Sequence, residues 1–227
     1  MKVLLICDDY WHPCQTAIDG VAPLKQQGFE FDIIKNAADF SVDMPEKYPV
    51  VLMCKSDEVS QTDKEPWRTD AVQNAFVSYI ENGGGLVAVH SAVVNSRNSQ
   101  VIDNLIGCRF LGHPNNCPVT VQPIKPHPVT EGVGLFCEID EHYRIEITSP
   151  DADIIAASYS PPQGDEAKFT EEPYFNTPAA ICPAAYARSP REGRICVLTP
   201  GHLLPVWLNP QFQKMLSNAL RWCAKGV

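Results

Sequence analysis

Short apolar runs divide the first half of the chain into strand-sized pieces separated by more polar segments. These runs lack a strict alternation of apolar and polar residues, and they cover residues 2–7, 29–34, 50–54 and 86–89. A continuous apolar run of this length is typical of a strand that is buried on both faces. The pattern therefore predicts parallel strands in the core of an α/β fold.

Helical spacing fills the gaps between these strands. Residues 16–27 form one candidate helix, which Gly28 ends. A second has apolar residues at i, i+4, i+7 and i+8 before the stop at Gly83, namely Val72, Phe76, Tyr79 and Ile80. In the last predicted helix, Asn209 is a good N-cap and Pro210 a good first residue. Its apolar face, which we expect to pack on the sheet, comprises Phe212, Met215, Leu216, Ala219, Leu220 and Cys223.

The second half of the chain has a different pattern. Residues 118–122 and 138–145 alternate in polarity, which is typical of antiparallel or edge strands. Three more strands are predicted at 153–158, 179–187 and 194–198. Between the first two of them, residues 161–178 are rich in proline and are predicted to form a mobile loop. No internal repeat or long linker is visible. We therefore expect one domain over residues 1–227, an α/β three-layer sandwich with a mostly parallel, flavodoxin-like central sheet plus an antiparallel excursion in the second half.

Charge and composition narrow the classes of partner. The 227 residues have a formal net charge of −9 and are 44% hydrophobic, so nucleic acid and anionic membranes are poor partners while a sizeable core fits. No apolar run reaches the ~18 residues of a membrane span, and the first run is too short for a signal peptide, which predicts a cytoplasmic location. The nine cysteines include no CxxC pair, which favours reduced, buried thiols over disulfides or a cysteine zinc site.

The block at residues 83–92 is the most informative motif. Three glycines precede an apolar run, and the run ends at His90 and Ser91, where we expect a strand-to-helix turn. In α/β folds such a turn lifts a side chain out of the carboxyl edge of the sheet. His202 follows the strand at 194–198 and should reach the same edge. Histidine at these places suits proton transfer or metal ligation, and a capping or solvated histidine is the alternative.

Two further groups of polar residues are candidates for chemistry. In the run 140–143, Glu141 and Tyr143 would share one face of a strand, and we favour this pair over Asp140 and His142 as ligand contacts. A solvated edge strand is the alternative. His113 is held between Gly and Pro, and the first loop contributes Asp8, Asp9 and His12, which could ligate a divalent cation. Plain turns and solvated loops explain these residues equally well.

In these blocks the chain resembles the ThuA-like (trehalose utilisation) family, whose fold is similar to that of class I glutamine amidotransferases. The resemblance rests on the order and spacing of 79–92, 110–114, 127–132, 140–143, 193–195, 201–202 and 220–222. In amidotransferases the elbow holds a nucleophilic cysteine and the late strand carries a His-x-Glu pair. This chain has His90 at the elbow, and Leu203 and Leu204 follow His202. The resemblance therefore implies a retained scaffold without glutamine amidotransferase activity.

What the resemblance implies about function is sugar metabolism, particularly of trehalose-related and keto disaccharides. We expect an enzyme, a sugar hydrolase, lyase or isomerase, in which His90 and His202 form an acid–base pair and Glu141 orients one of them. The residues expected to bind the substrate are His113, Tyr143, Asp8, His12 and Ser91. The predicted partner is a small-molecule sugar, and a homo-oligomer is compatible with the sequence.

Two alternatives stay open at this stage. One is a non-catalytic carbohydrate-binding module whose aromatic platforms are drawn from Trp11, Tyr143, Tyr174 and Trp207. The other is a metal-dependent hydrolase with ligands drawn from the first-loop carboxylates and from His90, His113, His142 and His202. No cofactor is predicted, although a divalent metal such as zinc would suit these residue types.

Overall fold

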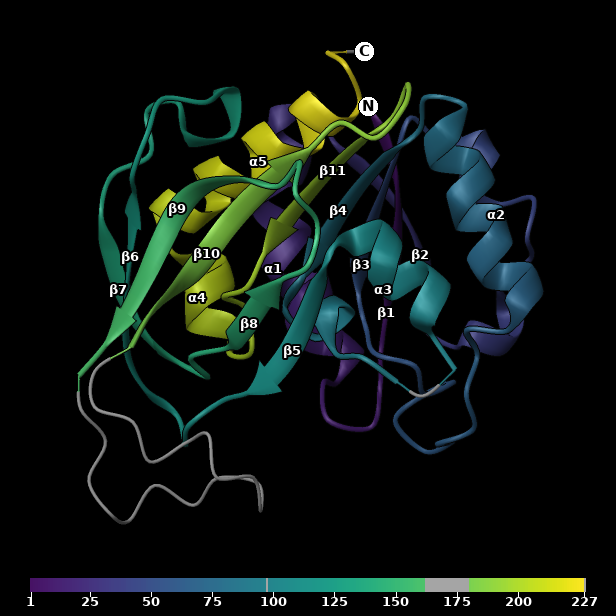
Figure 1. Ribbon diagram of the computed structural model, residues 1–227, viewed down its shortest axis with the longest axis horizontal. Helices are drawn as coiled ribbons and strands as arrows, with labels where there is room; N and C mark the ends of the chain where they lie inside the picture. The colour runs from purple at the N-terminus through teal and green to yellow at the C-terminus, as the bar shows by residue number, and fades with distance from the viewer. Residues whose placement is uncertain (97, 162–179, 227) are drawn as a thin grey trace.

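A mostly parallel sheet runs through the middle of the molecule. The computed structural model describes residues 1–96, 98–161 and 180–226, and among them a nine-stranded sheet has the order β2-β1-β3-β4-β11-β10-β9-β6-β7 (Figure 1). Its strands are β1 Lys2–Cys7, β2 Glu30–Ile34, β3 Val50–Cys54, β4 Gly85–Val89, β6 Cys117–Pro123, β7 Phe136–Asp140, β9 Asp153–Ser160, β10 Ala180–Arg188 and β11 Arg194–Leu198. A small second sheet pairs β5 Cys108–Gly112 with β8 Arg144–Ile147. The predicted α/β class is confirmed.

Helices cover both faces of this sheet. One face packs on α1 Cys14–Val21, α4 Leu204–Leu208 and α5 Pro210–Cys223, and the other on α2 Asp70–Glu81 and α3 Gln100–Ile106 (Figure 1). Short 3₁₀ helices lie at Ala22–Gln27, Ala37–Asp39, Pro45–Lys47, His90–Val93 and Pro128–Thr130. The strands β1, β3, β4 and β11 are parallel neighbours and almost wholly buried, as their continuous apolar runs predicted.

The last helix forms as its sequence predicts. The Asn209 side chain accepts a hydrogen bond from the backbone N–H of Gln211, and Pro210 is the first residue of α5. The whole predicted apolar face of α5 is buried, including Phe212 and Leu216. This face packs on β4 and β11, so α5 supports the middle of the sheet.

Two local predictions differ from the structure. The helix expected at residues 16–27 is α1 followed by a 3₁₀ helix that begins at Ala22, because Pro23 has no backbone N–H to continue the α-helical ladder. The strand expected at 138–145 is broken after Asp140, and its two parts join different sheets. The loop expected at 161–178 lies, apart from its first residue, outside the described residues.

The break after Asp140 has a physical cause. The imidazole of His142 is buried, and it lies 2.7 Å from the Ser160 hydroxyl and 2.9 Å from the Ser158 hydroxyl of β9. Tyr143 is buried in the core on the α2 and α3 side. These side chains tie residues 142 and 143 to different parts of the molecule from β7, which pairs with β6. The connection between β7 and β8 is therefore irregular.

The contact between α1 and α4 gives a stability prediction. A Cβ atom on Gly20 would lie 2.6 Å from Cβ of Trp207, which is buried and donates a hydrogen bond from its indole N–H to the Gly201 carbonyl at 2.7 Å. We expect Gly20→Ala to lower the free energy of unfolding by about 1–3 kcal/mol in urea titrations, despite the better helix propensity of alanine. Gly134→Ala is the matched control, since its Cβ would meet Gln211 at an ordinary 3.4 Å. Equal stability of the Gly20→Ala and wild-type proteins would contradict this packing.

Candidate functional site

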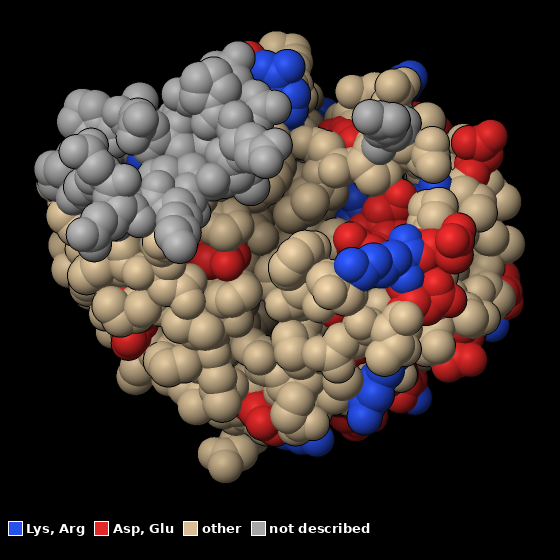
Figure 2. All heavy atoms as spheres, turned by 90° about the horizontal axis from the view of Figure 1, so that it is seen from below, with Lys and Arg blue, Asp and Glu red and all other residues tan. Residues whose placement is uncertain are grey.

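The candidate site lies at the carboxyl edge of the central sheet. His12 follows β1, His90 follows β4, His202 follows β11, and Glu141 follows β7. Because β1, β3, β4 and β11 are parallel neighbours, the loops that follow them meet at one edge. Figure 2 looks onto this edge and shows a hollow near the middle of the face, bordered largely by uncharged side chains.

Two residues at this edge have an uncommon backbone conformation. His90 begins a 3₁₀ helix immediately after β4 and has φ +48°, and Asp8 follows β1 with φ +78°. Both values lie in the left-handed region, which residues other than glycine adopt at a cost of about 1–3 kcal/mol. The sharp turn at His90 is the one that the sequence block 83–92 predicts. Its effect is to direct the imidazole across the edge of the sheet.

The His90 imidazole is buried with one nitrogen engaged by the backbone. Its Nδ1 lies 2.9 Å from the Thr199 carbonyl oxygen, so Nδ1–H donates and Nε2 has a free lone pair. This Nε2 lies 3.3 Å from Oε2 of Glu141. Burial lowers the pKa of His90 to about 4, although the neighbouring Glu141 carboxylate opposes this shift. The imidazole is therefore neutral near pH 7.

The His12 imidazole is oriented by Asp9. The Asp9 carboxylate is fully buried and accepts hydrogen bonds from His12 Nδ1 at 2.7 Å and from the backbone N–H groups of Trp11, His12 and Ser56. Burial would raise the pKa of Asp9, but these hydrogen bonds, with that of His12 foremost, hold it well below its usual range. Since His12 Nδ1 faces this carboxylate, its Nε2 is left with a free lone pair. That Nε2 lies 3.5 Å from the Tyr143 hydroxyl.

The loop that carries His202 is held by Asp140. The two oxygens of this buried carboxylate accept the backbone N–H groups of Gly201 at 2.8 Å and His202 at 2.9 Å. Burial raises the pKa of Asp140 to about 6, against the effect of these hydrogen bonds. Nδ1 of His202 is itself buried and makes no hydrogen bond within the described part of the chain, although Oε2 of Glu141 is only 3.2 Å away. Burial also lowers the pKa of His202 to about 4.

The four side chains converge on one point. His12, His90, Glu141 and His202 each offer one ligand atom, and these atoms all lie within 4.8 Å of one another. Burial would raise the pKa of Glu141, but its contacts with the neighbouring histidines, above all with His90, keep this pKa below its usual value. A carboxylate thus faces the lone pairs of neutral imidazoles, and such groups repel one another unless a cation or a proton lies between them.

The geometry fits a tetrahedral zinc ion. Zinc binds imidazole nitrogen at about 2.0–2.1 Å, which separates neighbouring ligand atoms by about 3.3 Å. Oε2 of Glu141 lies 3.3 Å from His90 Nε2 and 3.2 Å from His202 Nδ1. The remaining nitrogens of His12 and His90 are paired with a carboxylate and a carbonyl, as in histidines that ligate metals. The unpartnered His202 Nδ1 is a further sign that a ligand belongs here.

Aromatic side chains surround this cluster. The Tyr143 ring stacks on the His90 imidazole with centroids 3.7 Å apart, and Phe110 packs against Tyr143 on its other side. His113 lies at the entrance, with its side chain 30% exposed and its Nε2 3.6 Å from Oε2 of Glu141. The cavity among His12, His90 and His202 measures about 20 Å³. That volume suits an ion or a water molecule and excludes a sugar ring.

The other residues singled out from the sequence lie elsewhere. Asp8 does not face the cluster, because its two oxygens accept the backbone N–H groups of Cys14 and Gln61. Ser91 is buried in the wall of the small cavity. His142 is bonded to serines of β9 and is absent from the cluster, so it is not among the candidate ligands.

Two buried carboxylates orient the cluster in a way that was not predicted from the sequence: Asp9 was expected only as a possible cation ligand, and Asp140 was set aside in favour of Glu141. Asp9 stands three residues before His12, a spacing that permits the turn in which its side chain meets that imidazole. This spacing was a usable signal. Asp140 meets the loop at His202 from another strand, 62 residues away in the chain, and no sequence pattern connects the two.

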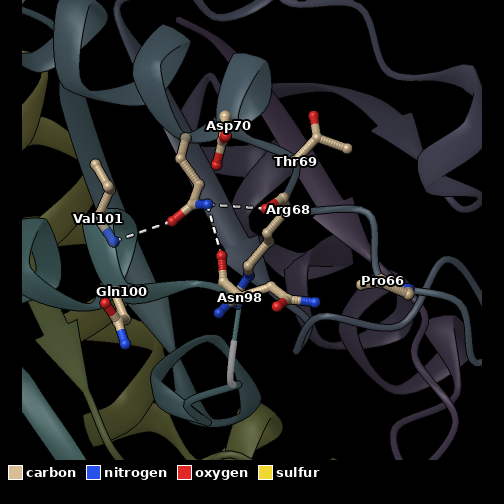
Figure 3. A pocket seen from close by; sticks show the side chains of 8 residues that line it. Pro66, Arg68, Thr69, Asp70, Asn98, Gln100 and Val101 are labelled. Atoms are coloured by element: carbon tan, nitrogen blue, oxygen red, sulfur yellow. Dashed lines mark hydrogen bonds between the residues drawn. The ribbon is translucent and has the colours of Figure 1, made fainter.

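A larger pocket lies away from this chemistry. It has a volume of about 460 Å³ and opens beside α2 and α3, where the Gln73 side chain bonds to the carbonyls of Arg68 and Asn98 and to the N–H of Val101 (Figure 3). Gln73 also accepts the N–H of Ile102, so its amide is fully used in joining the two helices. We therefore assign this pocket to the junction between α2 and α3 and do not consider it a reaction site.

The chain is similar to proteins of one family and to several solved structures. The ThuA family, described as trehalose utilisation, matches residues 2–223. No curated protein matches the sequence, and no described helix is long and apolar enough to cross a membrane.

Two of the similar structures are ThuA-like proteins. The one from Bacteroides uniformis is 23% identical, with a TM-score of 0.74 over 98% of this chain and 91% of that chain. The one from Parabacteroides merdae is 17% identical, with a TM-score of 0.73 over 100% of this chain and 90% of that chain. A cold-adapted β-galactosidase from Rahnella sp. R3 is 15% identical, with a TM-score of 0.63 over 96% of this chain but only 31% of its own. Since the family match spans nearly all of its residues, the chain belongs to the ThuA (trehalose utilisation) family.

Proposed function

We propose that this protein is an enzyme of carbohydrate metabolism whose reaction takes place at one divalent metal ion, best matched by zinc, held by His12, His90, His202 and Glu141. The observation that carries the proposal is the convergence of four potential ligand atoms within 4.8 Å of one another. Imidazole and carboxylate groups in this combination suit zinc.

Each residue has a distinct task in this proposal. His90 and His202 offer the lone pairs of neutral imidazoles, His12 presents its Nε2, and Glu141 offers an anionic oxygen that offsets the charge of a cation. Asp9 and the Thr199 carbonyl fix the ring orientations of His12 and His90. A divalent cation held by these four residues would polarise a sugar oxygen or a water molecule as a fifth ligand, because four protein ligands already fill a tetrahedral site. His113, partly exposed beside Glu141, is the side chain placed to exchange a proton with the substrate.

A sugar substrate is supported by the family and by the surroundings of the site. Trehalose utilisation is the description of the family, and the similar fold in the Rahnella protein is part of a β-galactosidase. The net charge of −9 fits a neutral small molecule better than a polyanion. We place keto derivatives of disaccharides first among the substrates, because a metal and a neighbouring base suit proton abstraction next to a carbonyl.

Glutamine hydrolysis is not part of this proposal. At the elbow after β4, where a glutamine amidotransferase would need its nucleophilic thiol, the residue is His90. The thiol nucleophile of that reaction is therefore missing at this position.

A second candidate uses the same residues without a metal. Nε2 of His90 lies within hydrogen-bonding distance of Glu141, so His90 and His202 could form an acid–base pair that shares a proton with this carboxylate. Turnover that persists in chelator-treated, metal-free protein would favour this second candidate over the metal-dependent enzyme. Sugar binding without any turnover would favour a carbohydrate-binding module.

The metal site can be tested by titration. We expect calorimetry with Zn²⁺ to give one tight site per chain, and Glu141→Gln and His202→Ala to weaken it more than about 100-fold, because each removes one of four ligands. His113→Ala is the matched control: it should keep the wild-type zinc affinity while losing turnover of a keto disaccharide followed by mass spectrometry. Wild-type zinc affinity in Glu141→Gln and His202→Ala would contradict the ligand set.

The orientation of His12 by Asp9 gives a second test. Asp9→Asn replaces the carboxylate that faces His12 Nδ1, so we expect zinc affinity to fall roughly 10–100-fold. The adjacent Asp8→Asn is the control, because Asp8 is also buried but its two oxygens accept the backbone N–H groups of Cys14 and Gln61 and contact no histidine of the cluster. The same loss of affinity in both variants would mean that loop stability, and not ring orientation, is responsible.

The buried histidines predict how stability depends on pH. Burial lowers the pKa of His90, His142 and His202 from 6.5 to about 4, so between these values the unfolded chain binds protons that the folded protein does not. The free energy of unfolding of the metal-free protein should therefore fall as the pH is lowered from about 6.5 to about 4. Asp140, with its pKa raised to about 6, and Asp103, whose pKa burial also raises, oppose this trend, whereas Asp9 and Glu141, whose pKa values are lowered, add to it. Urea titrations that show constant or rising stability over this range would contradict the neutral state of these imidazoles.

A further inference from the structure

Of the four aromatic side chains named from the sequence as possible sugar platforms, one is both described by the structure and exposed. Of the four named from the sequence, Trp207 is 1% exposed within the core and Tyr143 is 2% exposed beneath His90. Tyr174 lies outside the described residues. Trp11 is different, because its side chain is 66% exposed and it directly precedes His12 in the chain.

The turn that carries Trp11 is firmly held. Backbone hydrogen bonds join Asp9 and His12 in both directions, so Tyr10 and Trp11 occupy the tip of a tight turn. The N–H of Trp11 donates to Oδ1 of Asp9 at 2.9 Å, and the same oxygen accepts from His12 Nδ1. The carboxylate that orients a proposed metal ligand thus also fixes the backbone of the exposed tryptophan.

The indole of Trp11 has an open ring face. Its ring and that of Tyr10 meet edge to face, with centroids 4.7 Å apart, and Nζ of Lys64 lies 3.3 Å from the Tyr10 centroid. Lys64 therefore occupies a face of Tyr10, while an edge-to-face contact covers at most one face of Trp11. A large, rigid ring with an open face next to a polar cluster offers a contact surface for the apolar face of a ligand.

The size of the cluster also demands a binding surface outside it. The cavity of about 20 Å³ behind the three imidazoles is closed off by core residues such as Cys7, Cys54 and Trp207, so at most a single substrate oxygen, and no sugar ring, fits among these side chains. A sugar ring bonded to that oxygen must lie outside, against the loops at the rim. The first such loop carries Trp11, one residue from His12. The apolar C–H face of a pyranose ring complements an indole face, while its hydroxyls stay in water.

We propose that Trp11 is the stacking platform for a sugar ring of the substrate, placed so that an oxygen of that sugar reaches the cluster of His12, His90, His202 and Glu141. This inference rests on the proposed function for the choice of ligand, and it adds the residue that binds the ring. Trp11 contributes binding and positioning, with no proton transfer of its own.

The test uses trehalose as the probe and tryptophan fluorescence as the readout. Trp67 and Trp207 are buried and Trp222 is partly buried, so Trp11 is the most exposed reporter. We expect saturable trehalose binding by the wild-type protein, roughly tenfold weaker binding in Trp11→Ala, and a loss of about threefold or less in Trp11→Phe, which keeps a ring. Binding by Trp11→Ala and Trp11→Phe, which both lack this reporter, is measured by calorimetry. Leu135→Ala, which removes an exposed apolar side chain before β7 at the opposite edge of the sheet, should bind as the wild type does.

The outcomes separate this inference from the proposed function. Wild-type affinity in Trp11→Ala, an equal loss in Leu135→Ala, or no saturable binding of trehalose by the wild-type protein would each overturn the platform. The zinc content of every variant is measured in the same samples. Bound zinc together with no effect of Trp11→Ala contradicts only the platform. Absent zinc together with a tenfold effect of Trp11→Ala contradicts only the metal-dependent reaction.

Discussion

The site depends on electron-rich atoms that are forced toward one another. Burial keeps His90 and His202 neutral, and their free nitrogens face the Glu141 carboxylate at 3.3 and 3.2 Å. His12 presents its Nε2 to the same region because Asp9 engages its other nitrogen. Groups of this kind separate unless positive charge lies among them or the surrounding structure holds them in place. We therefore expect a cation or a proton to lie among these lone pairs.

The surrounding structure meets this constraint with unusual backbone geometry and buried carboxylates. His90 and Asp8 are held at positive φ, at a cost of about 1–3 kcal/mol each. Asp140 accepts two N–H groups from the loop at His202, and Tyr143 packs flat against His90. Packing further from the site contributes too, since the indole of Trp207 bonds to the Gly201 carbonyl from the layer beneath. The fold itself therefore holds the four candidate metal-binding atoms in position.

Much of this arrangement could be predicted from the sequence, and the failures have identifiable causes. The buried parallel strands correspond to continuous apolar runs, and the sequence of α5 contains both its N-cap residue and its buried apolar face. The fold class could therefore be predicted from the sequence. The parallel order also brings the ends of the strands together, which is why His90 and His202 could be placed at one edge. Glu141 and Tyr143 both contact His90, as expected for the pair, but the break after Asp140 that sends β7 and β8 to different sheets could not be derived from the local pattern.

The contribution of the first loop was predicted only in part. Asp8, Asp9 and His12 are all polar residues after β1, and nothing in their order shows which carboxylate turns inward. The positive φ of Asp8 sends its own side chain to Cys14 and Gln61 and leaves Asp9 facing His12. Backbone conformations of this kind depend on the assembled fold, so a local pattern does not reveal them.

Anomalous X-ray diffraction at the zinc absorption edge, from crystals grown with stoichiometric Zn²⁺, tests the central claim most directly. The structure predicts one strong peak per chain at about 2.0–2.2 Å from His12 Nε2, His90 Nε2, His202 Nδ1 and a Glu141 oxygen. A cluster that stays free of zinc under these conditions, or a peak held by other residues, would contradict it.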